Sequence, residues 1–150
     1  MSWAKDVAGG DAAAAPVFSL RAVGVVRSPL VRLADAPRQG AEGAPDAWLE
    51  IDVAYADALR GVAPGAELVV VTWLHLADRG VQQVHPRDDA SAPLTGVFAT
   101  RSPDRPNPLG LHRVRVRERS GMRLLVGPLE AVDGTPVVDL KVALPAVLPE

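Results

Sequence analysis

Hydrophobic and polar residues alternate along several short segments of the chain. In residues 47–54, Leu49, Ile51 and Val53 occupy every second position and two acidic residues lie between them. Successive side chains of a strand point to opposite faces, so this pattern predicts a half-buried β-strand. Apolar and β-branched runs predict further strands at residues 17–26, 68–76 and 96–100, on either side of Ser120-Gly121 within 111–132, and at 135–144.

Turn-forming residues divide these segments. Residues 30–46 contain repeated prolines and glycines without periodicity, which predicts a long loop, and a loop of that length is more often functional than idle. Residues 55–62 indicate a short helical turn closed by Gly61. Asp133-Gly134 lies between apolar runs and predicts a hairpin turn. About seven strands and one or two short helices indicate an all-β sandwich or barrel.

Composition sets the wider limits. The chain has 150 residues with 48% hydrophobic content, enough for one domain, which we expect at residues 17–150 after a mobile tail at 1–16. A net charge of −2 gives no general electrostatic reason to bind nucleic acid, so any such binding needs a local patch. There are no cysteines, and the histidines have no metal-ligand spacing, so we expect no metal. We expect a cytoplasmic protein, since neither a secretory signal nor a membrane span is present.

The segment GVFATRSPDRPNPLG, residues 96–110, is the most rigid and one of the most basic parts of the chain. Its three prolines fix their own φ angles and hold the residues before them in extended conformations. Arg101 and Arg105 offer planar forks for a carboxylate or phosphate, and Asn107 offers an amide that donates and accepts. Two interpretations stay open from composition: a stiff connection with solvated arginines, or a preorganised ligand loop.

Arginines occupy alternate positions in the next segment, at 113, 115, 117 and 119. A strand places all four on one face, where they match a phosphate backbone. The alternative is an ordinary soluble sheet face whose arginines pair with acids of a neighbouring strand.

Four segments, in this order and spacing, resemble the TsaA-like (TrmO) methyltransferases. They are VGVVRSPL (23–30), APRQG (36–40), GVFATRSPDRPNPLGL (96–111) and VDGTPVVDLK (132–141). The resemblance runs from about Phe18 to Leu144. It implies a small β-barrel that pairs as a homodimer, uses S-adenosylmethionine (SAM) and methylates threonylcarbamoyl-adenosine beside the anticodon of tRNA.

The resemblance also implies a set of SAM-binding residues. These are Pro37, Arg38, Gln39, His75, Leu76, Arg101, Leu111, Leu129, Glu130 and Ala131. For the methyl transfer we expect Arg101, Asn107 and Asp133 to be catalytic, with Asp133 or His75 accepting the proton of the acceptor. We expect Arg105, Arg113 and Arg115 to contact the substrate.

The chain departs from the family pattern at three positions. His112 stands where a small hydroxyl residue is usual, and Val142-Ala143 stand where Pro-Tyr is usual. We expect the compact form of the family, without the extra C-terminal domain that many bacterial members carry. The acceptor therefore stays open between tRNA and a small metabolite, and a non-enzymatic RNA-binding barrel is a third hypothesis.

Overall fold

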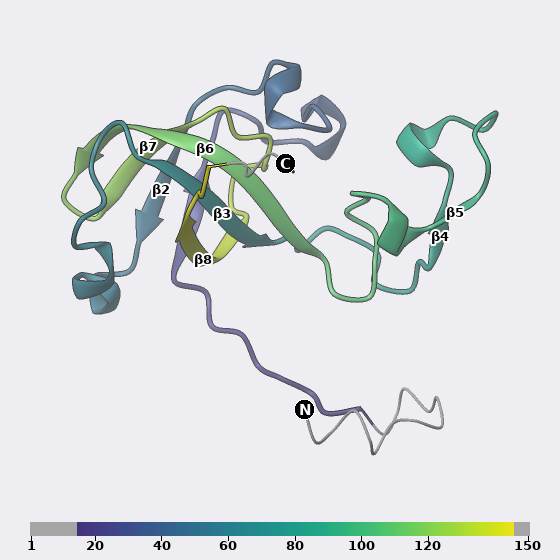
Figure 1. Ribbon diagram of the computed structural model, residues 1–150, viewed down its shortest axis with the longest axis horizontal. Coiled ribbons are helices and arrows are strands. Elements are labelled where there is room, and N and C mark those ends of the chain that lie inside the picture. The colour runs from purple at the N-terminus through teal and green to yellow at the C-terminus, as the bar shows by residue number, and fades with distance from the viewer. Residues whose placement is uncertain (1–14, 146–150) are drawn as a thin grey trace, which may run out of the picture.

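Six antiparallel strands close into a barrel in the computed structural model, which describes residues 15–145. Around the barrel the order is β1, β2, β7, β6, β3 and β8, and the pairing of β8 with β1 completes the closure (Figure 1). The bounds are β1 Gly24–Arg27, β2 Ala47–Ile51, β3 Glu67–Trp73, β6 Leu109–Ser120, β7 Arg123–Gly127 and β8 Pro136–Val142. The predicted all-β barrel is confirmed.

The alternating pattern of the sequence becomes the inside and outside of this barrel. Along β2, Ala47, Leu49 and Ile51 are buried and the residues between them are half-buried. Along β6, alternate residues from Gly110 to Val116 are buried while the intervening positions are exposed. The interior is therefore filled by small and branched apolar side chains from all six strands, as is typical of a narrow barrel.

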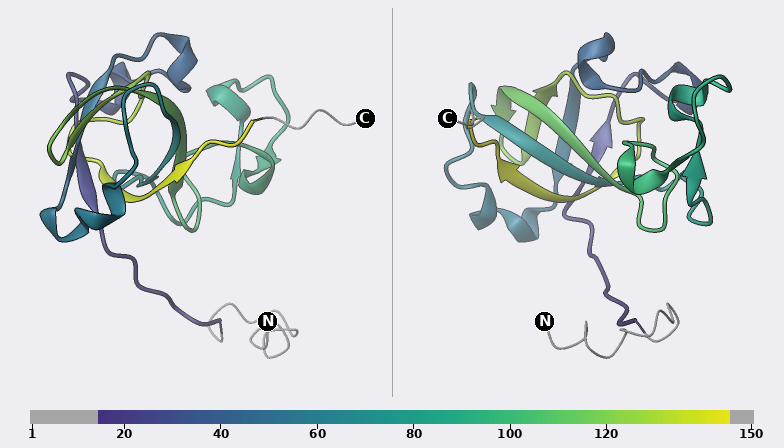
Figure 2. Two further views of the ribbon diagram at one scale, coloured as in Figure 1. Left: turned by 60° about the vertical axis from the view of Figure 1, so that its left-hand side comes forward. Right: turned by 45° about the vertical axis from the view of Figure 1, so that its right-hand side comes forward.

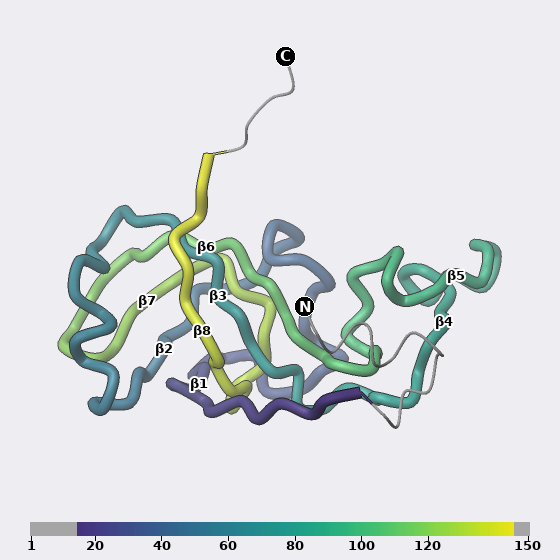
Figure 3. The backbone as a smooth tube through the Cα atoms, turned by 60° about the horizontal axis from the view of Figure 1, so that its bottom comes forward, coloured from purple at the N-terminus to yellow at the C-terminus, as the bar shows by residue number. Residues whose placement is uncertain are grey.

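An arm, residues 74–100, leaves the barrel between β3 and β6. It carries the two-stranded sheet of β4 (Gln83–Val84) and β5 (Thr95–Gly96) and the 3₁₀ turns η6 (Pro86–Asp88) and η7 (Val97–Ala99). Figures 1 and 2 show the arm to one side of the barrel, and Figure 3 shows the same arrangement from another direction. The remaining 3₁₀ turns are η2 Leu33–Asp35, η3 Gly40–Glu42, η4 Val53–Tyr55 and η5 Asp57–Leu59.

Several predicted boundaries were wrong. The strand expected at 68–76 ends at Trp73, and His75 lies in the exposed turn that begins the arm. The strand expected at 96–100 is limited to Thr95–Gly96, because the backbone turns into η7 directly afterwards. Only Gly24–Arg27 of the segment expected at 17–26 joins the barrel.

The predicted hairpin at Asp133-Gly134 was also wrong. Strands β7 and β8 are not neighbours in the barrel: β8 pairs with β1 and β3. Between them the chain runs through residues 128–132, of which Leu129, Ala131 and Val132 are buried. An Asp-Gly turn fixes local geometry only, and these buried residues carry the chain across the barrel before the turn occurs.

One of the expectations concerns residues that the structure does not describe. The tail predicted at 1–16 falls almost entirely on residues that the structure does not describe. Among residues 15–145, the structure contains no helix that is both long enough and apolar enough to cross a membrane.

Candidate functional site

The proline-rich loop, residues 101–108, is organised around the side chain of Arg105. Its Nε donates to the carbonyl of Ser102 at 2.8 Å, and its Nη2 donates to the carbonyls of Val97 and Thr100 at 2.7 Å each. These bonds tie the loop to η7 at the end of the arm. Arg105 was predicted to contact the substrate, whereas the structure gives its guanidinium a role in holding the loop.

Asn107 is held by a residue that the sequence did not single out. Arg79 donates from Nη2 to Asn107 Oδ1 at 3.1 Å and from Nε to the carbonyl of Pro106 at 2.7 Å. The same guanidinium lies 5.1 Å from the ring centroid of Trp73, the last residue of β3. These bonds hold the loop against the start of the arm. The Asn107 oxygen is occupied, and its amide nitrogen has no hydrogen-bond partner among residues 15–145.

Arg101 lies at an open edge of the barrel. The first half of β6, residues 109–113, pairs with β3, whereas pairing with β7 begins only at Arg115. Among residues 15–145 no strand covers the second edge of this half. Arg101 Nη2 approaches the carbonyl of Leu111 there at 3.4 Å, and the other N–H groups of the exposed guanidinium have no partner in the described part of the chain. This edge offers backbone donors and acceptors beside a free cation.

A chain of buried polar side chains supports the same half of β6 from inside. His112 is 5% exposed; its Nε2 is 2.7 Å from Thr72 Oγ1 of β3, and its Nδ1 is 2.5 Å from Glu130 Oε1. Gly110 makes room for this arrangement, since a methyl group there would overlap Thr72 Oγ1. The Thr72–His112–Glu130 chain therefore links two strands to the segment after β7.

Glu130 also touches the PRQG loop, residues 37–40. A methyl group on Gly40 would stand 3.2 Å from Glu130 Oε2 and 3.0 Å from the carbonyl of Pro128. The loop thus packs closely against the segment after β7 and brings Pro37, Arg38 and Gln39 to the neighbourhood of Glu130. The loop that carries three of the predicted SAM-binding residues thus lies beside Glu130 at Gly40.

Two crossed ion pairs join the loop after β1 to the arm. Arg38 contacts Asp88 at 2.7 Å, and Arg87 contacts Glu42 at 2.5 Å. The hydrogen bond from Arg87 holds the pKa of Glu42 below its ordinary value and raises the pKa of Arg87. Arg87 and Asp88 both have positive φ angles, 56° and 55°, a conformation that is uncommon for residues other than glycine. This interloop clasp fixes one end of the arm next to Arg38.

The remaining predicted SAM-binding residues fall into two groups. His75 and Leu76 are exposed in the turn after β3, which lies against the proline-rich loop through the bond from the Leu74 amide to the Pro108 carbonyl. Leu129 and Ala131 belong to the hydrophobic core. Their side chains face the interior, so these two residues have only backbone groups to offer a ligand.

Asp133 and the arginine face have contacts of their own. Asp133 Oδ1 accepts from the Ser28 amide at 3.0 Å and so ties together two of the family-like segments. Arg113 and Arg115 both pair with Glu67, at 2.9 and 2.6 Å. This is the arrangement of the simpler hypothesis, in which the arginines pair with acids of the adjacent strand.

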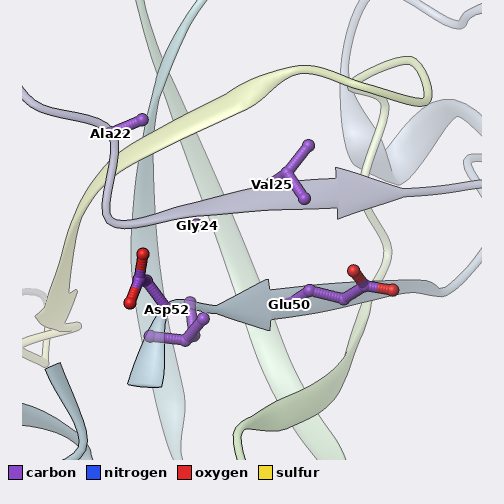
Figure 4. Close-up of a pocket in the computed structure, with 6 residues that line it drawn as sticks. Ala22, Gly24, Val25, Glu50 and Asp52 are labelled. Atoms are coloured by element: carbon purple, nitrogen blue, oxygen red, sulfur yellow. The ribbon is translucent and has the colours of Figure 1, made fainter. Parts of the chain in front are cut away.

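Two hollows of the structure are lined neither by Arg101 nor by residues 109–113. One of about 380 Å³ is lined by residues in and next to β1 and β2, including Glu50 and Asp52, and contains none of the predicted site residues (Figure 4). The other, of about 320 Å³, lies where Phe98 of the arm meets Pro106 of the proline-rich loop. A single chain therefore presents the candidate site as an open surface along β6. Within residues 15–145 no cluster of three or more histidine or acidic side chains is arranged to hold a metal ion.

The sequence did not predict the roles of several residues. These are Thr72 and His112 in the buried chain to Glu130, Arg79 as the partner of Asn107, and Asp88, Arg87 and Glu42 in the interloop clasp. For His112 a signal existed: the alternation that turns Arg113 and Arg115 outward turns His112 inward. No comparable signal exists for Arg79 or Asp88, since their partners are 28 and 50 residues away.

The barrel, the open edge and the family-like loops define a small β-barrel domain with a surface site along β6, and comparisons with known proteins identify its family. Residues 25–147 match the family described as the tRNA-methyltransferase O N-terminal domain. The chain therefore belongs to the TrmO family, and the predicted family is confirmed.

Individual relatives extend this result. A probable S-adenosyl-L-methionine-binding protein of Methanothermobacter thermautotrophicus is 44% identical over 81% of this chain and 87% of its own. The tRNA (adenine(37)-N6)-methyltransferase of Escherichia coli is 36% identical over 85% of this chain and 58% of its own. The crystal structure of TrmO from Pseudomonas aeruginosa superposes with a TM-score of 0.69 at 28% identity, covering 87% of this chain and 56% of that one. The chain thus spans a little more than half the length of these two methyltransferases.

Proposed function

We propose that this protein is a SAM-dependent methyltransferase whose acceptor is threonylcarbamoyl-adenosine next to the anticodon of tRNA. Family membership supports the methyltransferase, and the name of the 36% identical Escherichia coli relative supports an adenine of tRNA as acceptor. The structural observation that carries the proposal is the open edge of β6, which Arg101, Glu130 and the PRQG loop surround.

The residues at this edge have the chemistry that SAM requires. The cofactor carries a carboxylate, an ammonium group, ribose hydroxyls and an adenine. Arg101 has free N–H groups for the carboxylate, and Glu130 has an acceptor oxygen that no group among residues 15–145 uses. The second edge of residues 109–113, on which the Leu111 carbonyl lies, presents backbone groups that no neighbouring strand uses. We propose that Arg38, Gln39, His75 and Leu111 complete the walls.

When bound, SAM supplies a methyl group on a positively charged sulfur, which is displaced in line by the acceptor. The protein's contribution is then mainly positioning. The proline-rich loop is suited to this because Arg105 and Arg79 hold it in one conformation before a ligand arrives. Asn107 keeps its amide N–H available for an acceptor atom. The proton-accepting role of Asp133 or His75 stays a prediction, and His75, exposed beside the loop, is the better placed of the two.

For the substrate, we propose that Arg113 and Arg115 contribute long-range attraction to RNA. Their pairs with Glu67 are exposed, and exposed pairs contribute little to stability, so they do not prevent a phosphate from binding. A small-molecule acceptor is the second candidate, favoured by the same observation, because Glu67 neutralises part of the basic face. An acceptor in tRNA implies a cytoplasmic enzyme.

We also propose that the active form is a homodimer. The arm exposes Leu76, Leu94 and Phe98, with Phe98 85% exposed. A second copy seated on the arm would cover these side chains and add a wall to a site that is open in one chain. Light scattering coupled to gel filtration measures the oligomeric state, and a monomer at micromolar concentration contradicts this part.

The central experiment has two measurements. Isothermal titration of the protein with SAM should give saturable binding at one site per chain. Incubation with SAM and tRNA that carries threonylcarbamoyl-adenosine should then add one methyl group to that nucleoside, as detected by mass spectrometry. Binding of SAM without methylation or retention of tRNA, even at low salt, would favour the small-molecule acceptor. Absence of SAM binding would contradict the proposal as a whole.

A further inference from the structure

We propose that His112 is a positioning residue for the SAM site, acting through Glu130, and that Thr72 holds it in place. This inference rests on the proposed function, because it assigns a task to a buried group beside the proposed pocket. The three residues come from three elements: Thr72 from β3, His112 from β6, and Glu130 from the segment after β7.

One arrangement of donors satisfies every member of the Thr72–His112–Glu130 chain with a neutral ring. In it the Glu130 carboxylate accepts, and His112 carries a proton on Nδ1 and donates it to Glu130 Oε1. A neutral imidazole then has an acceptor at Nε2, to which the Thr72 hydroxyl donates. Both ring nitrogens have a partner in this arrangement, and the ring is locked in one orientation.

The consequence falls on Glu130. Its side chain is only 15% exposed, and one carboxylate oxygen is held by His112. The second oxygen, Oε2, has no hydrogen-bond partner among residues 15–145 and lies on the side of Gly40. His112 therefore directs a single free acceptor toward the space between the PRQG loop and β6.

A fixed, partly desolvated carboxylate oxygen favours a ligand that places a hydrogen-bond donor there. SAM carries O–H donors on its ribose, and the donor expected at this oxygen is one of its N–H groups, the exocyclic amine of the adenine or the ammonium group. Without His112 the carboxylate would be free to rotate toward solvent, and binding would have to order it again. The expected role is therefore in affinity and in selection for an N–H donor, while His112 itself touches no ligand.

Two conservative variants separate the two bonds of the ring. His112→Asn places an amide N–H near the position of Nδ1 and so keeps a donor to Glu130. In His112→Gln the longer side chain places its amide near the position of Nε2, next to Thr72, and the donor to Glu130 is lost. Glu130→Gln keeps the size of the side chain and removes its charge. His85→Gln is a matched control, because His85 is an exposed histidine whose ring bonds only the Ala92 carbonyl.

The first readout needs no cofactor. Proton NMR of the ligand-free protein should show a strongly downfield, slowly exchanging imidazole N–H proton from the His112 bond to Glu130. It should be absent in His112→Gln, weakened or absent in Glu130→Gln, and unchanged in His85→Gln. Retention of this resonance in His112→Gln would contradict the assigned hydrogen bond.

The second readout is SAM affinity by titration, with thermal melting alongside. The affinity should fall by about tenfold in His112→Gln and Glu130→Gln, since a hydrogen bond to a charged group is lost, and stay within about threefold of wild type in His112→Asn. Equal losses in His112→Asn and His112→Gln, or no loss in either, would overturn the positioning role. If His112→Gln does not fold, the SAM affinities of Glu130→Gln and His112→Asn are compared instead. A loss in the first alone supports the positioning role, and equal losses or no loss in either overturn it.

The two proposals fail separately. If wild-type protein does not bind SAM, the proposed function fails, whereas the NMR resonance still tests the orientation of Glu130. If wild type binds SAM and the His112 variants bind it equally well, only the positioning role fails.

A third comparison tests which N–H donor Glu130 accepts from. S-inosylhomocysteine, which has a carbonyl in place of the adenine amine, should bind wild type more weakly than S-adenosylhomocysteine does. Glu130→Gln should narrow that difference if the adenine amine is the donor, and leave it unchanged if the ammonium group is.

Discussion

The two halves of β6 share one alternating pattern and have different surroundings. In residues 109–113 one edge pairs with β3, and within residues 15–145 no strand covers the other edge, where Arg101 approaches the Leu111 carbonyl. From Arg115 onward β7 covers that edge. The inward positions differ as well, with Gly110 and His112 in the first half and two valines in the second.

The outward arginines show the same contrast. Arg119 in the second half donates to the carbonyls of Leu59 and Val62 at 2.8 Å each, and so holds the turn before β3. Arg113 in the first half has one exposed carboxylate as its partner. Where a strand lacks a neighbour on one edge, its backbone and side-chain groups stay available to a ligand. Where both neighbours are present, the same groups form hydrogen bonds within the sheet and stabilise the fold. The contrast predicts that changes in the first half affect ligands and changes in the second affect folding.

The largest effect is expected from Arg101→Ala, which removes the cation at the open edge. Methyl transfer should fall by about a hundredfold, because a charged hydrogen bond to the ligand is lost, with little change in melting temperature. Steady-state kinetics and a thermal melt on the same preparation measure both. Arg101→Lys keeps the charge without the planar fork and should recover only part of the rate. A fully active Arg101→Ala variant removes this residue from the site.

Arg119→Ala tests the second half. Loss of its two bonds to carbonyls of the preceding turn should lower the free energy of unfolding by about 1–2 kcal/mol, since both lie near the surface. Urea denaturation measures this change. SAM affinity should stay as in wild type, and a weakened affinity at unchanged stability would reverse the assignment of the two halves.

Gly40→Ala moves the wall that faces the open edge. The added methyl group meets the Pro128 carbonyl and Glu130 Oε2 at 3.0 and 3.2 Å, so loop and segment must separate slightly. We expect SAM to bind about fivefold more weakly, a loss of about 1 kcal/mol. Gly96→Ala is the control, because a methyl group there has open space and the φ angle is an ordinary −60°. Identical affinities in the two variants would argue against a pocket wall at Gly40.

The double variant Arg113→Ala with Arg115→Ala tests the outward arginines where the two halves of β6 meet. If both arginines contact phosphates, the slope of log K for tRNA against log salt should become shallower by about 1.5. Fluorescence anisotropy over a salt series measures the slope, and Lys141→Ala is a control with one exposed cation on β8. An unchanged slope means that the pairs with Glu67 serve only the sheet surface.

The smallest effect concerns the clasp between Glu42 and Arg87. Because the folded-state pKa of Glu42 is lowered, its contribution is fully present above the ordinary glutamate pKa and is lost as the pH falls through the lower, folded-state value. The protection factors of the backbone amides at residues 85–89 against hydrogen exchange should therefore fall as the pH is lowered, and fall less in Glu42→Gln, which lacks the titrating group. Identical pH profiles in both proteins would show that the pair does not hold the arm.

The alternation at 47–51 and 113–116 predicted which side chains are buried, because a two-residue period allows only two faces. Beyond Val116 it did not, since residues 117–120 are all exposed. The same rule failed for the ends of strands. Apolar residues continue past Trp73 to Leu76, yet the strand stops where the chain leaves for the arm, and Leu76 is exposed. The prediction that Val53 lies on the buried face of a strand was wrong for the same reason, since β2 ends at Ile51 and Val53 is exposed in η4.

The candidate site was predicted in part. The family-like segments supplied the residues that line the open edge, such as Arg101 and the PRQG loop. They did not reveal that Arg105, four residues from Arg101, holds the loop through its own carbonyls. Two arginines in one short motif look equivalent in sequence, and only the path of the backbone decides which guanidinium faces inward.

By itself the sequence determined the all-β class, the two faces of each strand and the family, because periodicity and motif spacing are local properties of the chain. The tertiary structure alone decided that β7 leaves half of β6 uncovered and that Thr72, His112 and Glu130 meet. It also decided that Arg38 and Arg87 form a clasp with acids from each other's loops. These contacts join residues 18 to 50 positions apart, and barrel closure, which brings such positions together, depends on all six strands at once.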